Sequence, residues 1–398
     1  MTAPTTQNGQ SHTNIDSPSL PAVVRPFMLR FQLALALFFV VAALGCGQRR
    51  VVIESYPESD AARLEAATAD AGQTLVRDVE AFAVSGIDVI LKPTPGKPTV
   101  SLGLYLRGGS AQAKPEDVGL ETLMMQLVAE GGSETQPRDV MLSRLGLLGG
   151  AIGGDAAALT CTFGLEALRK NWDDSFALFA DVVMHPAWPA DELERMRTRQ
   201  LEFLESLPEN PDTYVTLLSE DLLLGEHPYR QRAWGTPENI GRFGVEELRA
   251  HYAEVLVKSR MLFVVVGDVT RAELEQKLAA SFATLPEGSP VALELPPLVE
   301  REPGYAGFAK ATPTSYVLAS FRAPEPSSDE YYAMVVALSL LGDRLFEKVR
   351  SDMQLSYAVA AGVDDSPSNS GYLYVSSSSP ALAYAQILDE VESMQDWL

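Results

Sequence analysis

The histidines and cysteines of this chain are too few and too scattered to form a familiar metal site. The 398-residue sequence contains four histidines and two cysteines, which are His12, His185, His227, His251, Cys46 and Cys161. No two histidines lie within five positions of each other, so no helix carries the i, i+4 histidine pair that ligates zinc from one face. Two cysteines cannot build a cysteine zinc cluster or a disulfide framework. The sequence therefore argues against a metal centre in this chain.

The elements that would position functional side chains form an α+β pattern. Apolar residues recur at helical spacing from Gly119 to Glu130, whereas they alternate strictly from Val100 to Leu106, as in a strand with one buried face. The same patterns predict further helices at 137–148, 166–184, 189–206, 212–224, 245–256, 270–283, 329–348 and 381–398. They predict a hairpin at 82–91 and strands at 159–165, 261–266, 315–321, 357–363 and 372–376.

This order predicts two similar halves, each with helices packed on a mostly antiparallel sheet. We expect a first domain at 78–284, a proline-rich linker at 285–300 and a second domain at 301–398 that is shorter and looks truncated. The glycine-rich segment Gly149–Gly154 has no phosphate-loop lysine, so we expect it to be a flexible turn and a hinge. Cys161 lies in an alternating apolar run and is expected to be a small buried hydrophobe.

The N-terminus has the features of an export signal. A basic segment, Arg25–Arg30, precedes fourteen apolar-rich residues, Phe31–Leu44, which are short for a membrane span. Ala43–Cys46 resembles a bacterial lipoprotein signal, which predicts a signal peptide at 1–45, lipid attachment at Cys46 and a tether at 46–77. We therefore expect a lipid-anchored protein of the bacterial envelope, on the outer membrane facing the periplasm. A plain transmembrane anchor is the alternative.

The negative net charge of the chain argues against some classes of binding partner. The formal net charge is -22 and the isoelectric point is about 4.6. A chain this acidic repels nucleic acid, so no nucleic-acid partner is expected. Attraction of basic peptides is compatible with this charge, although acidic surfaces commonly serve solubility alone.

Several short motifs occur in an order typical of one peptidase family. They are Gly108–Ser110, Gly119–Leu120, Gly131–Gly132, His227–Ile240, Leu262–Asp268, Arg344–Arg350 and Leu355–Tyr357. Together they resemble the insulinase/pitrilysin family, which includes the mitochondrial processing peptidases and has an inverted zinc motif. The resemblance extends over roughly residues 80–398.

The resemblance implies that the zinc motif has been lost. Active family members carry H-x-x-E-H on the helix that begins here at Gly119, with the histidines as ligands and the glutamate as general base. The corresponding positions are Thr122, Met125 and Gln126. Threonine and glutamine are poor zinc ligands, and methionine has no proton to transfer. Glu202 falls near the third ligand, but without the histidines it remains an orphan candidate.

A second functional motif is retained. Arg350 and Tyr357 are seven positions apart, which matches the arginine–tyrosine pair that reaches the substrate in active complexes of the family. An arginine offers a rigid fork of donors to a peptide carbonyl or carboxylate, and a tyrosine hydroxyl can donate to a developing oxyanion. The resemblance therefore implies that these two residues bind substrate.

These observations lead to one main hypothesis and two alternatives. The main hypothesis is a non-catalytic subunit that holds peptide substrates for a homologous, zinc-bearing partner, with no cofactor of its own. The first alternative is a structural scaffold with the same fold. The second is an autonomous zinc metallopeptidase with unusual ligands drawn from Glu202 and unpaired histidines.

Metal analysis tests the loss of the zinc motif. We expect the purified chain from Gly47 onward to contain no stoichiometric zinc and to cleave no peptide, with or without added zinc, because the ligand positions cannot coordinate it. One zinc per chain together with chelator-sensitive cleavage would reverse this conclusion.

Overall fold

The computed structural model describes residues 79–292, 294–364 and 366–394. The predicted signal peptide, Cys46 and the tether at 46–77 lie outside these residues. In the described part of the chain, no helix combines the length and hydropathy that a bilayer span requires.

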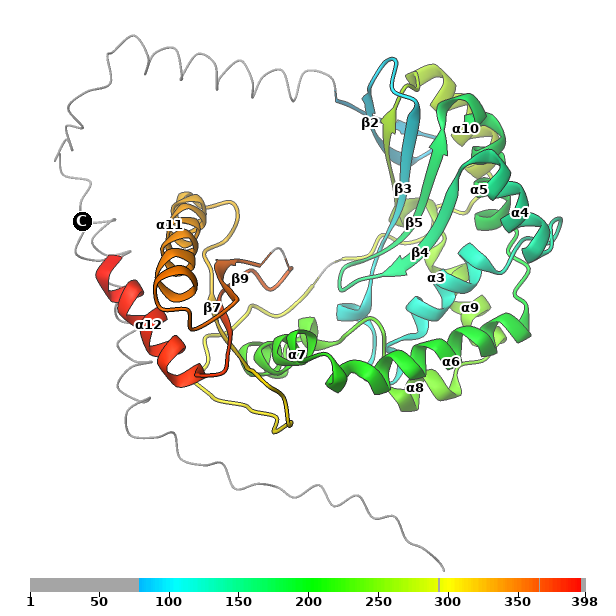
Figure 1. The fold of residues 1–398 in the computed structure, drawn as a ribbon. Coiled ribbons are helices and arrows are strands. Elements are labelled where there is room, and N and C mark those ends of the chain that lie inside the picture. The colour runs from blue at the N-terminus through cyan, green and yellow to red at the C-terminus, as the bar shows by residue number, and fades with distance from the viewer. Residues whose placement is uncertain (1–78, 293, 365, 395–398) are drawn as a thin grey trace, which may run out of the picture.

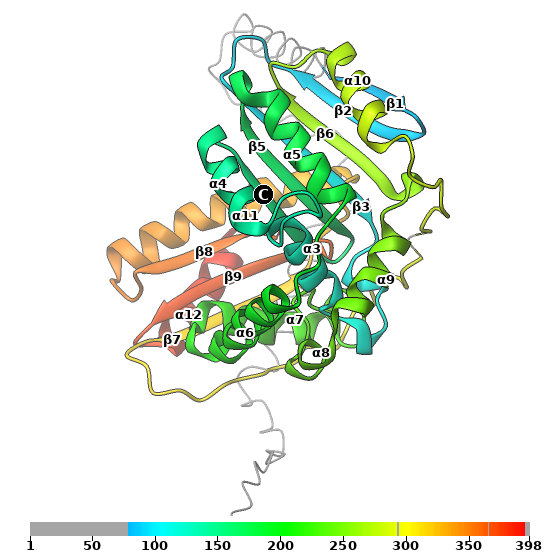
Figure 2. The same ribbon diagram turned by 90° about the vertical axis from the view of Figure 1, so that its right-hand side faces the viewer.

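The first half is built on a six-stranded sheet (Figures 1 and 2). Its strands are β1 (Glu80–Val84), β2 (Ile87–Pro93), β3 (Thr99–Arg107), β4 (Ala151–Ala156), β5 (Thr160–Leu168) and β6 (Met261–Gly267). Their spatial order is β1-β2-β6-β3-β5-β4, and every neighbouring pair is antiparallel except β2 and β6. The mostly antiparallel sheet is thus confirmed.

Ten helices accompany the strands within the described residues. They are α3 (Leu120–Glu130), α4 (Arg138–Leu148), α5 (Trp172–Met184), α6 (Ala190–Ser206), α7 (Pro211–Leu224), α8 (Pro237–Arg242), α9 (Val245–Val255), α10 (Arg271–Phe282), α11 (Asp329–Leu345) and α12 (Pro380–Ser393). Helices α3, α4, α5 and α10 cover one face of the first sheet (Figure 2).

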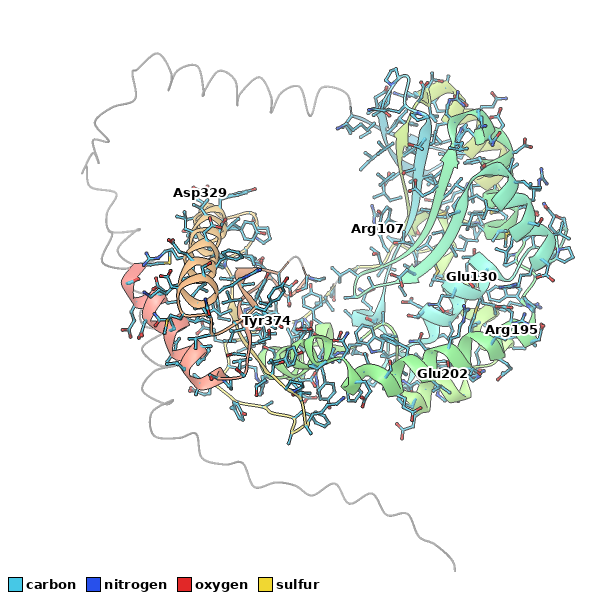
Figure 3. All side chains as sticks on the ribbon, in the orientation of Figure 1. Arg107, Glu130, Arg195, Glu202, Asp329 and Tyr374 are labelled. Atoms are coloured by element: carbon cyan, nitrogen blue, oxygen red, sulfur yellow. The ribbon has the colours of Figure 1, made fainter. Side chains whose placement is uncertain are left out.

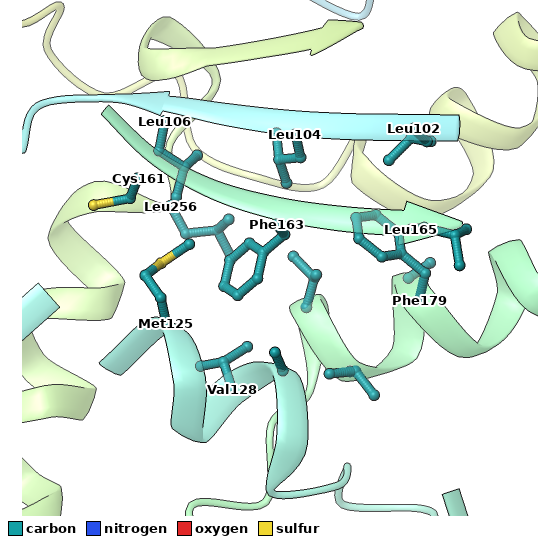
Figure 4. Packing of buried hydrophobic residues seen from close by; sticks show 14 of the residues in the cluster. Leu102, Leu104, Leu106, Met125, Val128, Cys161, Phe163, Leu165, Phe179 and Leu256 are labelled. Atoms are coloured by element: carbon teal, nitrogen blue, oxygen red, sulfur yellow. The ribbon is translucent and has the colours of Figure 1, made fainter. Parts of the chain in front are cut away.

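Strand alternation explains how the core forms. The even-numbered residues of β3 from Val100 to Leu106 are 2% exposed or less, and they point toward the helices. Cys161, Phe163 and Leu165 on β5 pair with β3 in register and bury the same face (Figure 4). The expectation that Cys161 is a buried hydrophobe is confirmed. The predicted hairpin is also present, with Gly86 at φ 89° in its turn.

The second half repeats part of this arrangement. Strands β7 (Ser315–Arg322), β8 (Ala358–Val363) and β9 (Ser370–Ser377) form an antiparallel sheet in the order β7-β9-β8. This matches the order β3-β5-β4, and in each half the helical segment lies between the first two strands of the series along the chain. The α+β class with two similar halves is confirmed. The described second half has three strands where the first has six.

Helix α7 joins the two halves (Figure 1). It packs against β7, and the Ser219 hydroxyl donates to the Ser320 hydroxyl at 2.7 Å. The Tyr374 hydroxyl on β9 donates to the Asp212 carboxylate on α7. Burial, and then this carboxylate, raise the pKa of Tyr374. The packing of α7 on the second sheet therefore includes at least these two hydrogen bonds.

Two expectations about local structure were wrong. Residues 166–168 continue strand β5, so the helix predicted from 166 begins only at Trp172. The segment Gly149–Gly154 is not a flexible hinge, because residues 151–154 belong to the edge strand β4. Gly154 faces α3 so closely that a Cβ there would lie 2.1 Å from the carbonyl oxygen of Met125. Close helix–strand packing explains this glycine.

Substitutions of two adjacent glycines should separate this packing from simple flexibility. We expect Gly154→Ala to lower the free energy of unfolding by about 2 kcal/mol in urea titrations, because the new methyl group forces α3 away from β4. The matched control is Gly153→Ala, whose Cβ would meet no atom within 4 Å and should leave stability unchanged or slightly higher. Equal effects of the two substitutions would contradict this account.

Candidate functional site

The positions of the lost zinc motif lie on α3 and are committed to packing. Thr122 is 5% exposed, and its hydroxyl donates to the carbonyl oxygen of Ala233 at 2.6 Å. Met125 is fully buried, and Gln126 is half-buried. The structure therefore places a hydrogen-bonded hydroxyl and a core thioether at two of the three positions where the family's motif has a ligand and a base.

Met125 is an integral part of the hydrophobic core. Its side chain packs in the cluster that includes Phe163 on β5 and Leu256 after α9 (Figure 4). A flexible thioether fills such irregular space well, whereas a carboxylate there would lose its hydration without a cationic partner. Met125 therefore serves packing at the position where the resemblance places the family's general base.

Glu202 does not face α3. It lies on α6 and is exposed (Figure 3), whereas Gln200 on the same helix is 8% exposed. Residues two positions apart in an α-helix point about 200° away from each other, so the side chains of Gln200 and Glu202 lie on opposite sides of α6. The Gln200 amide donates to the carbonyl oxygen of Trp234 at 2.9 Å, next to the Ala233 carbonyl that binds Thr122. Gln200 is therefore the α6 residue that faces the former zinc region.

The side chains of His227 and His251 make contacts away from the positions on α3. His251 lies with Nε2 3.1 Å from a carboxylate oxygen of Glu121. The Nδ1 atom of His227 accepts the Tyr229 backbone N–H, and its Nε2 lies 2.8 Å from the carbonyl oxygen of Pro296 in the segment between the halves. Across residues 79–292, 294–364 and 366–394, no three histidine, cysteine, aspartate or glutamate side chains converge to hold a metal ion.

Cys161 lies near Glu121 but is not poised for chemistry. Burial, and then the charge and hydrogen bond of Glu121, raise the pKa of the Cys161 thiol well above its usual value. The thiol therefore stays protonated at neutral pH, and the thiolate is the nucleophilic form.

The second half brings Arg350 and Tyr357 together. Arg350 belongs to a π-helical turn, Phe346–Asp352, that continues α11, and Tyr357 directly precedes β8. The guanidinium carbon of Arg350 lies 4.4 Å from the centre of the Tyr357 ring and 4.6 Å from that of the Phe346 ring. Tyr357 is 81% exposed. The pair is thus preformed at the surface.

The arginine keeps its hydrogen-bond donors available. Within the described residues, Arg350 has no carboxylate oxygen within 4.0 Å and makes no hydrogen bond. By contrast, Arg344 on the same helical segment is bonded to Glu390 at 2.8 Å and to Ser393. A free, planar set of N–H donors beside a free phenol suits a peptide carbonyl or carboxylate. Phe346 joins Arg350 and Tyr357 as the third member of this side-chain cluster. The sequence did not single it out, although its i, i+4 spacing to Arg350 could have indicated it.

The fold and this pair define a peptidase-like protein that lacks the zinc ligands. Two family models match the chain: "Insulinase (Peptidase family M16)" over residues 88–227 and "Peptidase M16 inactive domain" over residues 242–397. The chain therefore belongs to the insulinase family, peptidase family M16, and includes a domain of its inactive type.

One of two curated relatives is described as a protease and the other as a non-peptidase. YmxG of Bacillus subtilis, described as an uncharacterized zinc protease, is 22% identical over 281 residues, which are 69% of this chain and 67% of that protein. YmxG of Helicobacter pylori, described as a non-peptidase homolog, is 24% identical over 288 residues, which are 69% of this chain and 64% of that protein. The alignments thus span about two thirds of each relative's length.

Solved structures share the fold. A peptidase M16 inactive domain from Pseudomonas fluorescens superposes with a TM-score of 0.71 at 21% identity, over 79% of this chain and 78% of that one. The periplasmic protease PqqL of Escherichia coli superposes with a TM-score of 0.60 at 14% identity, over 80% of this chain but only 39% of that one. At these identities the likeness establishes the fold alone.

Restoring the general base by itself should damage the protein. We expect Met125→Glu to lower the free energy of unfolding by about 2 kcal/mol or more, because the new carboxylate enters an apolar core without a partner. Gln126→Glu at the half-buried neighbour is the control and should change stability by less than about 0.5 kcal/mol. Chemical denaturation measures both. Full stability of Met125→Glu would show that the core around α3 is adaptable.

Proposed function

We propose that this chain is a non-catalytic subunit that holds peptide substrates for a homologous, zinc-bearing partner. The observation that carries the proposal is the contrast between the two halves. Thr122 and Met125 on α3 are hydrogen-bonded or packed internally, whereas Tyr357 is exposed and the half-buried Arg350 beside it has free side-chain donors. A subunit that has lost chemistry but retains substrate contacts fits this contrast.

The length relationship with PqqL supports a paired assembly. Most of this chain corresponds to well under half of the PqqL chain, of which a "first half" has also been solved separately. A protease of that size has room for two units of this kind in one polypeptide. This chain corresponds to one such unit, and we propose that it pairs with a zinc-bearing unit of the same family.

The edge of the first sheet offers a second contact for an extended peptide. Strand β4 pairs only with β5 among the described strands, and its other edge carries unpaired backbone groups. Such an edge can accept an extended peptide as an added strand, with main-chain hydrogen bonds that do not depend on sequence. This supports a role in holding unfolded or short peptides of varied sequence.

The proposed location rests on the N-terminal sequence. The basic segment, the short apolar run and Gly45–Cys46 support export and lipid attachment at Cys46. Attachment there would place the peptidase-like halves at the bacterial envelope, on the outer membrane facing the periplasm, where a periplasmic zinc-bearing partner is accessible.

Substitution of the pair tests substrate holding. We expect Arg350→Lys and Tyr357→Phe each to lower kcat/KM of the mixture with a zinc-bearing family member from the same organism by about tenfold or more. Each change removes a charge-assisted or oxyanion-directed hydrogen bond. The chain alone should show no cleavage.

Exposed residues of the same types provide the controls. Arg249→Lys on α9 and Tyr332→Phe on α11 should leave kcat/KM unchanged. If mixing produces no activity with any zinc-bearing homologue, or if the pair and the controls behave alike, the scaffold alternative is favoured.

A further inference from the structure

The Arg350 guanidinium lies over two aromatic rings, which together form an aromatic clamp. Phe346 and Tyr357 lie 4.6 and 4.4 Å from it, measured from the guanidinium carbon to the ring centres. Attraction between a cation and a ring occupies the faces of the guanidinium and leaves its in-plane N–H donors free. The clamp therefore fixes the orientation of Arg350 without consuming the groups that a ligand would need.

A partly buried arginine such as Arg350 would ordinarily pair with an acid. Glu347 is exposed and lies three residues before Arg350, within the same π-helical turn. Arg197 pairs with Glu194 at this same spacing, and Arg195 does so with Glu192. No such ion pair forms between Arg350 and Glu347. The contacts that Arg350 makes instead are with the two rings.

The exposure of Phe346 indicates that core packing does not explain this residue. Phe346 is 48% exposed, whereas Leu345 and Val349 beside it are fully buried in the core of the second half. A large apolar side chain left half in water contributes little to the core. The π-helical form of this turn is rare and occurs frequently at functional sites.

We propose that Phe346 is a positioning residue, which clamps Arg350 against Tyr357 and keeps its donors directed to a peptide carbonyl or carboxylate rather than to Glu347. This inference rests on the proposed function for its peptide ligand, but the clamp itself is a property of this chain alone. Phe346 touches no substrate in this scheme and acts only through Arg350.

The clamp has a spectroscopic signature. Protons of the Arg350 side chain that lie over two ring faces should resonate upfield in NMR spectra of the chain from Gly47 onward, labelled selectively in arginine. The Arg350→Lys variant assigns the signal. We expect Phe346→Leu to lose a large part of the upfield shift and Phe346→Trp to retain it, because tryptophan also presents a π face. Urea unfolding should be unchanged for Phe346→Trp and nearly so for Phe346→Leu.

Peptide binding supplies the functional arm. With a short, fluorescein-labelled, unstructured peptide as the probe, we expect Phe346→Leu to weaken binding about three- to fivefold and Phe346→Trp to restore it. Adding Glu347→Gln to Phe346→Leu should also recover binding, since it removes the competing carboxylate. A purely structural role of Phe346 would not produce recovery by a change at Glu347.

The outcomes separate the two ideas. The positioning role is overturned if the upfield NMR shift of the Arg350 protons is unchanged in Phe346→Leu. It is also overturned if that shift is lost but the affinity for the peptide is unchanged. If the unsubstituted chain binds no peptide while the shift pattern follows the expectation, the proposed function fails and the clamp remains as a property of the structure. Recovery of both shift and affinity by the aromatic variant supports the inference.

Discussion

The contact between helix α3 and strand β4 constrains the first half of this protein. Gly154 allows the helix backbone to lie directly on the strand, and a single methyl group there would overlap with the Met125 carbonyl. This approach fixes the face of α3 that enters the core. Once that face is fixed, Met125 must be apolar, and Thr122 must satisfy a carbonyl of the neighbouring loop. The scaffold of a metallopeptidase is thereby preserved while its reactive positions serve packing.

The two halves use burial in opposite ways. In the first half, the helix that carries the former motif is enclosed between the sheet and α5, α6, α8 and α9, so any charge placed at Met125 would be desolvated. In the second half, Arg350 and Tyr357 lie at the surface, where a cation remains hydrated and stays available to a ligand. Access to water therefore decides where each half can carry a charge.

Hydrogen bonds made by helix α7 contribute to the contact between the two halves. The hydrogen bonds of Tyr374 to Asp212 and of Ser219 to Ser320 define geometry, but they bury less apolar area than a domain core does. Burial raises the pKa of Glu220 on the same helix, while the charge of Arg232 acts in the opposite direction.

Apolar periodicity in the sequence was sufficient to identify the α+β class, the hairpin at Gly86, strand β3 and helix α3, because it reports which face of an element is buried. The resemblance to the family's arginine–tyrosine motif singled out Arg350 and Tyr357. It did not indicate the ring of Phe346 beside them, since that contact depends on how a π-helical turn meets the start of β8. The glycine content of residues 149–154 suggested a hinge. The structure shows an edge strand there, in which the close approach of α3 explains Gly154. Counting positions suggested Glu202, whereas the side of α6 that packs inward is that of Gln200. Local patterns determine the elements and their apolar faces; contacts between residues distant in sequence decide which side chains meet.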